Sequence, residues 1–263
     1  MKESAEIGII GGTGVYDPGI FEDVKEIKVY TPFGKTSDLV SLGHYKGRAI
    51  AFIPRHGRNH QIPPHMINFR ANIWAMKELG VKRIISPSAV GSLREDYKPG
   101  DLVLVDQFID RTRGRRDTFY EGGQVCHISS ADPFCPELRK IFLDSAKKMG
   151  IPCHERGTYV CIQGPRFSTR AESKLFRSWE ADVIGMTVYP ECVLARESEM
   201  CYVSLCMITD YDVWAEKAVS AEEVVKTMEK NVENVKELMM KTMLLIPRER
   251  SCVCGYALKE ALM

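Results

Sequence analysis

Strand-like runs alternate with helical patterns along almost the whole of this chain, and that alternation limits its fold more than any other feature. The strand-like runs are short and rich in Ile, Val and other apolar residues, at 7–10, 49–53, 83–85, 102–105, 159–162 and 202–208. Longer stretches with helical spacing lie between them, at 64–79, 136–149, 169–179, 190–200 and 221–245. This pattern predicts an α/β fold with a central mixed sheet flanked by helices. At 263 residues, we expect a single domain, 1–263, with a tail at about 246–263.

Charge and hydropathy exclude several classes of partner. The 36 Lys and Arg residues nearly balance the 35 Asp and Glu residues, so bulk charge does not favour nucleic acid or a membrane surface. No apolar stretch approaches the roughly 18 residues that a membrane span requires. The first six residues are too polar for a secretion signal, and we expect a cytoplasmic protein. Any anion that the protein binds must therefore be held by local groups.

Three polar stretches follow strand-like runs and have the chemistry of anion sites. Gly11-Gly12-Thr13-Gly14 allows close approach of backbone N–H groups and adds a hydroxyl, but matches neither a dinucleotide nor a Walker motif. Arg55 and His56 follow the second run, and guanidinium and imidazole groups donate to phosphate oxygens. The stretch 86–92 has small residues and hydroxyls at the end of a third run. Taken singly, each also fits a tight turn or a solvated loop.

Two further stretches could bind a flat ring. Phe167 lies on a loop that Gly164 and Pro165 introduce, and its ring could stack on a base or simply cap the core. Asp210 and Asp212 follow the last strand-like run at alternate positions, so their side chains point the same way if the backbone stays extended. Such a pair could accept from an exocyclic amine and protonate a ring nitrogen. The alternative is a helix N-cap.

The nine cysteines give no clear metal motif. Most are expected to be reduced and buried. Cys252 and Cys254 form a Cys-x-Cys near the end of the chain, but no second close pair of cysteines accompanies them and no histidine follows His154. The usual zinc spacing is therefore absent, and we expect no metal. Whether these two cysteines form a disulfide stays open.

These five polar stretches, in this order, resemble the methylthioadenosine phosphorylases and the trimeric-type purine nucleoside phosphorylases. The resemblance covers the chain from Ile7 to about Leu245 and includes the runs 100–111, 132–136 and 164–172. It is most similar to archaeal-type members. The fold implied is the nucleoside phosphorylase fold, and the implied reaction is phosphorolysis of a purine nucleoside by a pentosyltransferase, in purine and methionine salvage.

The resemblance implies a role for each matching position. Phosphate, the co-substrate, would be bound by Thr13, Arg55, His56, Ser88, Ala89 and Thr187. The nucleoside would be bound by Phe167, Met186, Asp210 and Asp212, the two aspartates being catalytic. The pocket for the 5' substituent would be formed by Ser168, Val219, Ala221, Val224 and a neighbouring subunit's His127. Ser88 replaces the threonine of animal-type members, and Gly185 stands where some members carry asparagine.

The implied mechanism needs neither a metal nor an organic cofactor. The C1'–N9 bond stretches first, phosphate stabilises the cationic ribose and then attacks C1', and Asp210 with a raised pKa protonates N7. Asp212 would accept from N6–H, and the late helix has no histidine for a 5'-hydroxyl. Both features favour 5'-methylthioadenosine as substrate.

Three alternatives stay open at this point. The chain could be a broad or 6-oxopurine nucleoside phosphorylase, a nucleosidase, or a non-catalytic nucleoside-binding module. The contribution of His127 would require a homo-oligomer, and the family suggests a trimer or a hexamer.

Overall fold

Strand β5 (Arg83–Ser92) lies at the centre of the molecule and organises the sheet around it. The structure is a computed structural model that describes residues 3–12, 18–215 and 221–263, with only the backbone of 221 and 223–231. Strand β1 (Ile7–Gly11) and strand β11 (Cys201–Asp210) pair with β5 in parallel on its two sides. The last residues of β5 pair instead with β10 (Val183–Gly185), antiparallel. Strands β1, β10 and β11 are therefore all held by hydrogen bonds to β5.

The other strands complete a mixed sheet of eleven strands among the described residues. Its main path runs β2-β3-β4-β1-β5-β10-β9-β7, and β11, β6 and β8 branch from β5. These remaining strands are β2 (Glu22–Ile27), β3 (Val40–Tyr45), β4 (Arg48–Pro54), β6 (Leu102–Leu104), β7 (Gln107–Arg111), β8 (Cys153–His154) and β9 (Thr158–Ile162). Parallel and antiparallel pairs both occur, which confirms the predicted mixed sheet of an α/β fold.

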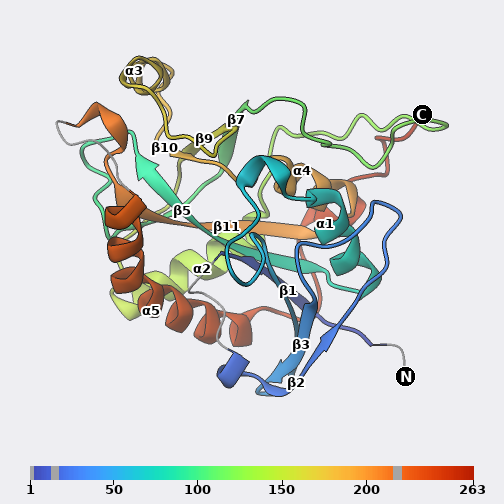
Figure 1. Ribbon diagram of the computed structural model, residues 1–263. Coiled ribbons are helices and arrows are strands. Elements are labelled where there is room, and N and C mark those ends of the chain that lie inside the picture. The colour runs from blue at the N-terminus through green and yellow to red at the C-terminus, as the bar shows by residue number, and fades with distance from the viewer. Residues whose placement is uncertain (1–2, 13–17, 216–220) are drawn as a thin grey trace.

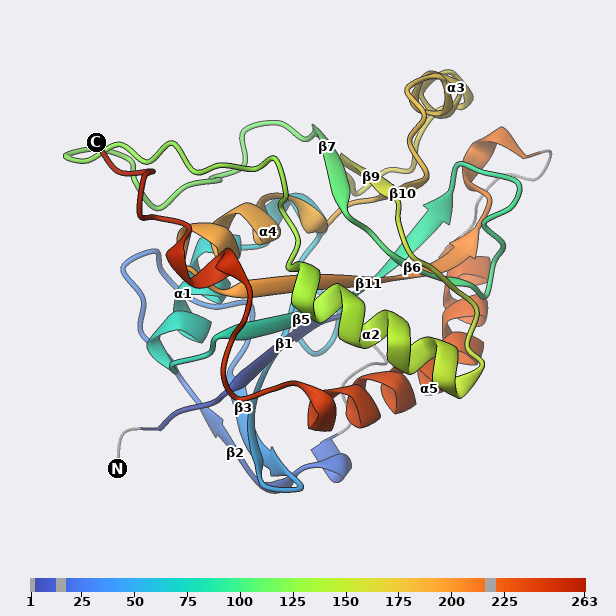
Figure 2. The same ribbon diagram turned by 180° about the vertical axis from the view of Figure 1, so that it is seen from behind.

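Helices cover both faces of the sheet (Figures 1 and 2). On one face α1 (Phe69–Glu78) packs against α4 (Val188–Glu197), and on the other α2 (Pro136–Met149) packs against α5 (Ala221–Leu245). Helix α3 (Arg170–Ser178) stands out from the body, beginning at a capping box between Thr169 and Glu172. None of the described helices is long and apolar enough to cross a membrane.

Several elements differ from the sequence prediction. The strand expected at 83–85 runs on to Ser92, so the expected turn at 86–92 is part of a strand. The helix expected from residue 64 begins at Phe69, because the side chain of Asn68 caps it and 64–66 form a separate short 3-10 turn. Strands β2, β3, β7, β8 and β10 were not predicted, and β2 is almost wholly exposed and lacks an apolar signal.

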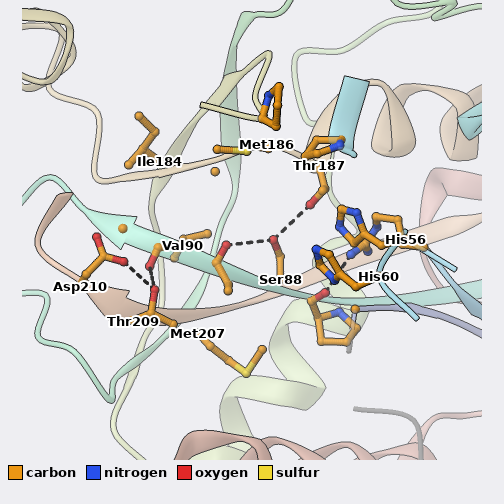
Figure 3. Close-up of a pocket in the computed structure, with 18 of the residues that line it drawn as sticks. His56, His60, Ser88, Val90, Ile184, Met186, Thr187, Met207, Thr209 and Asp210 are labelled. Atoms are coloured by element: carbon orange, nitrogen blue, oxygen red, sulfur yellow. Dashed lines mark hydrogen bonds between the residues drawn. The ribbon is translucent and has the colours of Figure 1, made fainter. Parts of the chain in front are cut away.

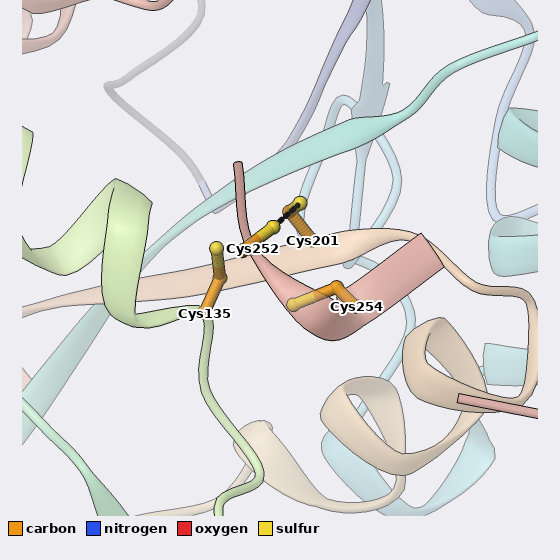
Figure 4. A group of neighbouring side chains, drawn as sticks. All are labelled: Cys135, Cys201, Cys252 and Cys254. Atoms are coloured by element: carbon orange, nitrogen blue, oxygen red, sulfur yellow. Dashed lines mark hydrogen bonds between the residues drawn. The ribbon is translucent and has the colours of Figure 1, made fainter. Parts of the chain in front are cut away.

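The C-terminal segment is held by a cluster of four cysteines (Figure 4). Cys135 caps α2, Cys201 begins β11, Cys252 precedes the short 3-10 turn Val253–Tyr256, and Cys254 lies within that turn. All four sulfur atoms lie within 4.8 Å of one another, with 3.3 Å between Cys201 and Cys252, and all four are free thiols. The sequence argument against zinc rested on the lack of a second cysteine pair, and this convergence removes that ground.

Candidate functional site

A cavity of about 950 Å³ opens beside the carboxyl ends of β1, β4 and β11 and along the second half of β5. Ligands of open α/β sheets bind at such strand ends. Figure 3 shows hydroxyl and imidazole groups of Ser88, Thr187, His56 and His60 toward one end of it. Asp210 lies at the opposite end. The cavity therefore has two chemically different ends, here called the hydroxyl end and the carboxylate end.

Most of the predicted site residues line this one cavity. They come from five separate stretches of sequence and are Arg55, His56, Ser88, Ala89, Phe167, Ser168, Met186, Thr187, Asp210 and Asp212. His127 does not line it and is exposed on the segment after β7. Thr13 and Val219 lie outside the described residues, as do the side chains of Ala221 and Val224.

At the hydroxyl end, Arg55 uses most of its guanidinium on the protein itself. It is 1% exposed and forms a two-pronged ion pair with Glu191 of α4, at 2.8 Å from Nε and 3.0 Å from Nη2. Nη2 also lies 2.6 Å from both the carbonyl oxygen of Ile10 and Oγ of Ser86, and Nη1 donates to the carbonyl of Pro87 at 3.2 Å. One N–H of Nη1 remains for a ligand. The forked pair Nε and Nη2 is therefore used on Glu191, and the predicted phosphate contact of Arg55 can come only from Nη1.

The sequence analysis missed Glu191, the partner of Arg55. It is fully buried and also accepts hydrogen bonds from the hydroxyls of Ser86, at 2.7 Å, and Tyr202, at 2.8 Å. Burial by itself would lower the pKa of Arg55, but the charge of Glu191 outweighs it and raises that pKa. The only sequence signal was a carboxylate between apolar residues in the first half of α4, where a buried charge needs a partner.

The other groups of this end are held by hydrogen bonds within the protein. Oγ of Ser88 lies 3.2 Å from Oγ1 of Thr187, and the backbone N–H of Thr187 donates to Oη of Tyr159 at 3.3 Å. Nδ1 of His56 lies 2.9 Å from the carbonyl oxygen of Ile62. These contacts fix the hydroxyls and the imidazole ring, so this end is ordered without a ligand.

The carboxylate end is built on a sharp bend after β11. Oδ2 of Asp210 accepts from the hydroxyl of Thr209 at 2.7 Å, and Oδ1 accepts from the backbone N–H of Asp212 at 2.8 Å. Asp212 has a left-handed backbone, with φ of 49°, and begins a 3-10 turn, so the expected extended geometry is wrong although both side chains reach the cavity.

Asp212 has a raised pKa. Burial, followed by repulsion from Asp210 and Glu172, raises the pKa of this carboxyl group, and its Oδ2 has no hydrogen-bond partner within the described residues. The sequence analysis expected a raised pKa at Asp210, which stays a prediction. The raised pKa of Asp212 was not anticipated.

Between the two ends, Gly185 and Met186 form part of the cavity wall. A Cβ atom at Gly185 would lie 2.0 Å from Oη of Tyr159, so glycine is required here. Tyr159 is fully buried and occupies the space that the asparagine of some similar proteins would need. This explains why the chain departs from that pattern.

Helix α5 contributes three cavity residues that the sequence analysis did not name. Val232, Glu233 and Lys236 line the cavity, and Nζ of Lys236 lies 3.2 Å from Oε1 of Glu233. Residues 232 and 236 are four apart, so helical spacing places them on one side of the helix. The sequence analysis looked for an apolar lining at 219–224 and did not use this spacing. Among the described residues, the ligand atoms close enough to hold a metal ion belong to the cysteine cluster and not to this cavity.

Comparison with known proteins places these features in context. Residues 6–244 match the family model described as the phosphorylase superfamily. The chain is 60% identical to S-methyl-5'-thioadenosine phosphorylase of Thermofilum pendens, over 99% of this chain and 100% of that protein.

Two solved structures agree with the fold. Methylthioadenosine phosphorylase from an antarctic soil metagenomic library is 44% identical, with a TM-score of 0.94 over 100% of this chain and 93% of its own. Methylthioadenosine phosphorylase from Schistosoma mansoni in complex with adenine is 38% identical, with a TM-score of 0.92 over 97% of this chain and 96% of its own. The likeness thus spans the whole fold and is not limited to the motifs.

The buried ion pair gives the first testable prediction. Glu191→Ala leaves the Arg55 guanidinium buried without its partner, and such losses cost about 3–5 kcal/mol in the free energy of unfolding. Denaturant unfolding at equal protein concentration measures the difference. The control is Glu78→Ala, which removes an exposed carboxylate from α1 and should have little effect. Equal stabilities of the two variants would show that the ion pair is not a structural element.

Proposed function

Because the chain belongs to the phosphorylase superfamily, we propose that it cleaves 5'-methylthioadenosine with inorganic phosphate, yielding adenine and 5-methylthioribose 1-phosphate. One observation carries the proposal: a single cavity has hydroxyl groups and a histidine at one end and two carboxyl groups at the other (Figure 3). Phosphate fits the hydroxyl end and a purine the carboxylate end. Phosphate would then lie next to the glycosidic bond that it cleaves.

The protein's contribution to this reaction is to position the two substrates. Phosphate would be bound by the hydroxyls of Ser88 and Thr187, the ring of His56, the remaining N–H of Arg55 and the Ala89 backbone. Thr13, which lies outside the described residues, remains proposed for the same site. Met186 lies between the ends, where the ribose would bind. Alignment of two reactants in one site converts a bimolecular step into a nearly unimolecular one.

At the carboxylate end, Asp210 and Asp212 would bind the edge of the base while Phe167 covers its face. Departure of the purine places negative charge on its imidazole ring, and a proton at N7 neutralises it. The pair supplies that proton and an acceptor for N6–H. Two interacting carboxyl groups titrate together, so the proton belongs to the pair rather than to one residue.

The 5' substituent would lie against Ser168 and the late helix. Val232 of α5 is an apolar wall residue of the cavity, which suits a methylthio group better than a hydroxyl. Val219, Ala221 and Val224 remain proposed for the same pocket. Inorganic phosphate is a co-substrate, and the proposed reaction requires no other cofactor.

The proposed enzyme is a cytoplasmic homo-oligomer, a trimer or a hexamer. His127 supports this, because it is exposed and does not line the cavity of its own chain. In the oligomer, His127 would complete the pocket of a neighbouring subunit.

A 6-oxopurine nucleoside phosphorylase is the second candidate. The raised pKa of Asp212 favours it, because a protonated carboxyl group can donate to O6 of inosine or guanosine. The ionised form accepts from the N6 amine of adenine instead. Hydrolysis of the nucleoside without phosphate is the third candidate function. The presence of the hydroxyl end, which fits phosphate, argues against it.

The function is tested by release of free base from methylthioadenosine, adenosine and inosine, with and without phosphate. We expect release to require phosphate and kcat/KM to be highest for methylthioadenosine by about tenfold, or 1.4 kcal/mol. Release without phosphate would identify a nucleosidase. An equal or higher kcat/KM for inosine would favour the 6-oxopurine reaction.

Base selectivity is tested by Asp212→Asn. An amide can donate to a 6-oxo group, whereas an ionised carboxylate only accepts, so the kcat/KM ratio of methylthioadenosine to inosine should fall about tenfold. Asp132→Asn, at an exposed position, is the control and should leave the ratio unchanged. An unchanged ratio in Asp212→Asn would remove this residue from the recognition of N6.

The contribution of His127 is tested by complementation between subunits. His127→Ala and Asp210→Asn should each lose most activity alone, since each lacks one part of every site. Co-expressed with two affinity tags and purified as mixed oligomers, they should recover activity, because some sites combine an intact cavity with an intact His127 from a neighbour. Mixed oligomers that stay as inactive as the separate variants would place His127 outside the site.

A further inference from the structure

The hydrogen-bonding state of His56 is fixed by its backbone neighbour. A carbonyl oxygen only accepts hydrogen bonds, so the 2.9 Å contact between Nδ1 of His56 and the Ile62 carbonyl places a hydrogen on Nδ1. The Ile62 backbone N–H donates in turn to the His56 carbonyl oxygen at 3.0 Å. These two bonds hold the ring in one orientation. Nε2 is then the only ring nitrogen that His56 can offer to the cavity that it lines.

The surroundings keep the His56 ring neutral. Burial is the largest cause, and the positive charge of Arg55 and the stacked ring of His60, at 4.4 Å between centroids, act in the same direction. Together they lower the pKa of His56 to about 4, although the Ile62 carbonyl opposes the shift. Above that pH a ring with its hydrogen on Nδ1 has a lone pair on Nε2. His56 is therefore an acceptor toward the cavity, where the sequence analysis expected a donor.

The cations that line the cavity do not change this conclusion. Within the described part of the chain they are Arg55 and Lys236, and each has a carboxylate partner, Glu191 at 2.8 Å and Glu233 at 3.2 Å. An anion that approaches His56 therefore meets a lone pair and must bring its own hydrogen. Hydrogenphosphate carries one P–OH group, whereas sulfate at neutral pH carries none.

We propose that Nε2 of His56 accepts a hydrogen bond from the P–OH group of bound hydrogenphosphate, and that this bond selects phosphate over sulfate. The proposal rests on the proposed function and deepens it at the hydroxyl end. It makes His56 a specificity-determining residue, in place of a general anion donor.

The atoms balance in the proposed reaction. The C1'–N9 bond breaks with its electron pair going to the purine, and a phosphate oxygen forms the new bond to C1'. The P–OH group keeps its hydrogen and its bond to Nε2 while the new bond to C1' forms. The carboxyl pair gives a proton to N7 of the purine. The sugar phosphate leaves with its P–OH hydrogen and can lose it to water, and the carboxyl pair takes one proton back from water.

Competition between anions tests the proposal in the intact protein. Binding of inorganic phosphate and of sulfate is measured by calorimetry from pH 8 to pH 4.5, for the natural protein, His56→Gln and His44→Gln. At pH 8 the natural protein should bind phosphate at least about tenfold more tightly than sulfate, because two acceptors face each other in the sulfate complex. The difference in affinity should begin to narrow toward pH 4.5, where part of His56 is protonated and can donate.

The variants separate this role from a general effect. Glutamine can present an amide N–H at the place of Nε2, so His56→Gln should bind the two anions within about threefold of each other at pH 8. His44→Gln makes the same change at an exposed position and should keep the natural preference. Equal binding of both anions by the natural protein at pH 8, or an unchanged preference in His56→Gln, would overturn the proposal.

A spectroscopic measurement covers the case in which His56→Gln does not fold. The ¹⁵N shifts of His56 in the phosphate complex at pH 8 should show a protonated Nδ1 and a nonprotonated Nε2. A doubly protonated ring would overturn the proposal. If release of base requires phosphate but the protein binds phosphate and sulfate equally well, only this role of His56 is refuted. If release of base does not require phosphate, the proposed function is refuted.

Discussion

The ion pair between Arg55 and Glu191 is the interaction on which the rest of the site depends. It joins the end of β4 to α4, and its hydrogen bonds extend to β1 through Ile10, to β5 through Ser86 and to β11 through Tyr202. Neither charge has a stable state in this interior without the other. The elements that carry the hydroxyl end are thereby fixed relative to one another before any ligand binds. Such preorganisation lowers the cost of ordering the groups during reaction.

The carboxylate end has the opposite character. Asp212 is buried, has a left-handed backbone and a raised pKa, and leaves Oδ2 without a hydrogen-bond partner in the described structure. Each of these costs free energy in the ligand-free protein, and such costs concentrate at functional sites. A purine edge, with its N6 amine as donor and N7 as acceptor, would give that carboxyl group hydrogen-bond partners. The hydroxyl end therefore has its hydrogen bonds in place without a ligand, whereas the carboxylate end would gain hydrogen-bond partners from one.

Strong local patterns made the main parts of the fold predictable from the sequence. Apolar runs identified β1, β4, β9 and β11, and the order of polar stretches after them identified most of the cavity residues. Strand β2 has five exposed residues of six and β10 has three residues, so neither has a periodic signal. Glu191, the partner of Arg55, lies 136 residues away, and the four cysteines come from three distant segments. These residues meet only in the folded chain, and no short segment of the sequence contains all of them.

The pairing of Arg55 with Glu191 also bears on how the proposed reaction would be driven. In a dissociative displacement the ribose becomes cationic before phosphate attacks, and the negative charge of phosphate is its nearest stabilising group. An unpaired arginine against phosphate would bind it tightly but neutralise the charge that the transition state needs, and equal stabilisation of ground and transition states does not accelerate the chemistry. Here Glu191 balances the arginine, and a neutral His56 that accepts a hydrogen bond adds no positive charge to the site. Phosphate would then keep its charge for the ribose. In the proposed reaction the buried carboxylate would therefore serve catalysis as well as the fold, because it prevents the phosphate site from being too positive.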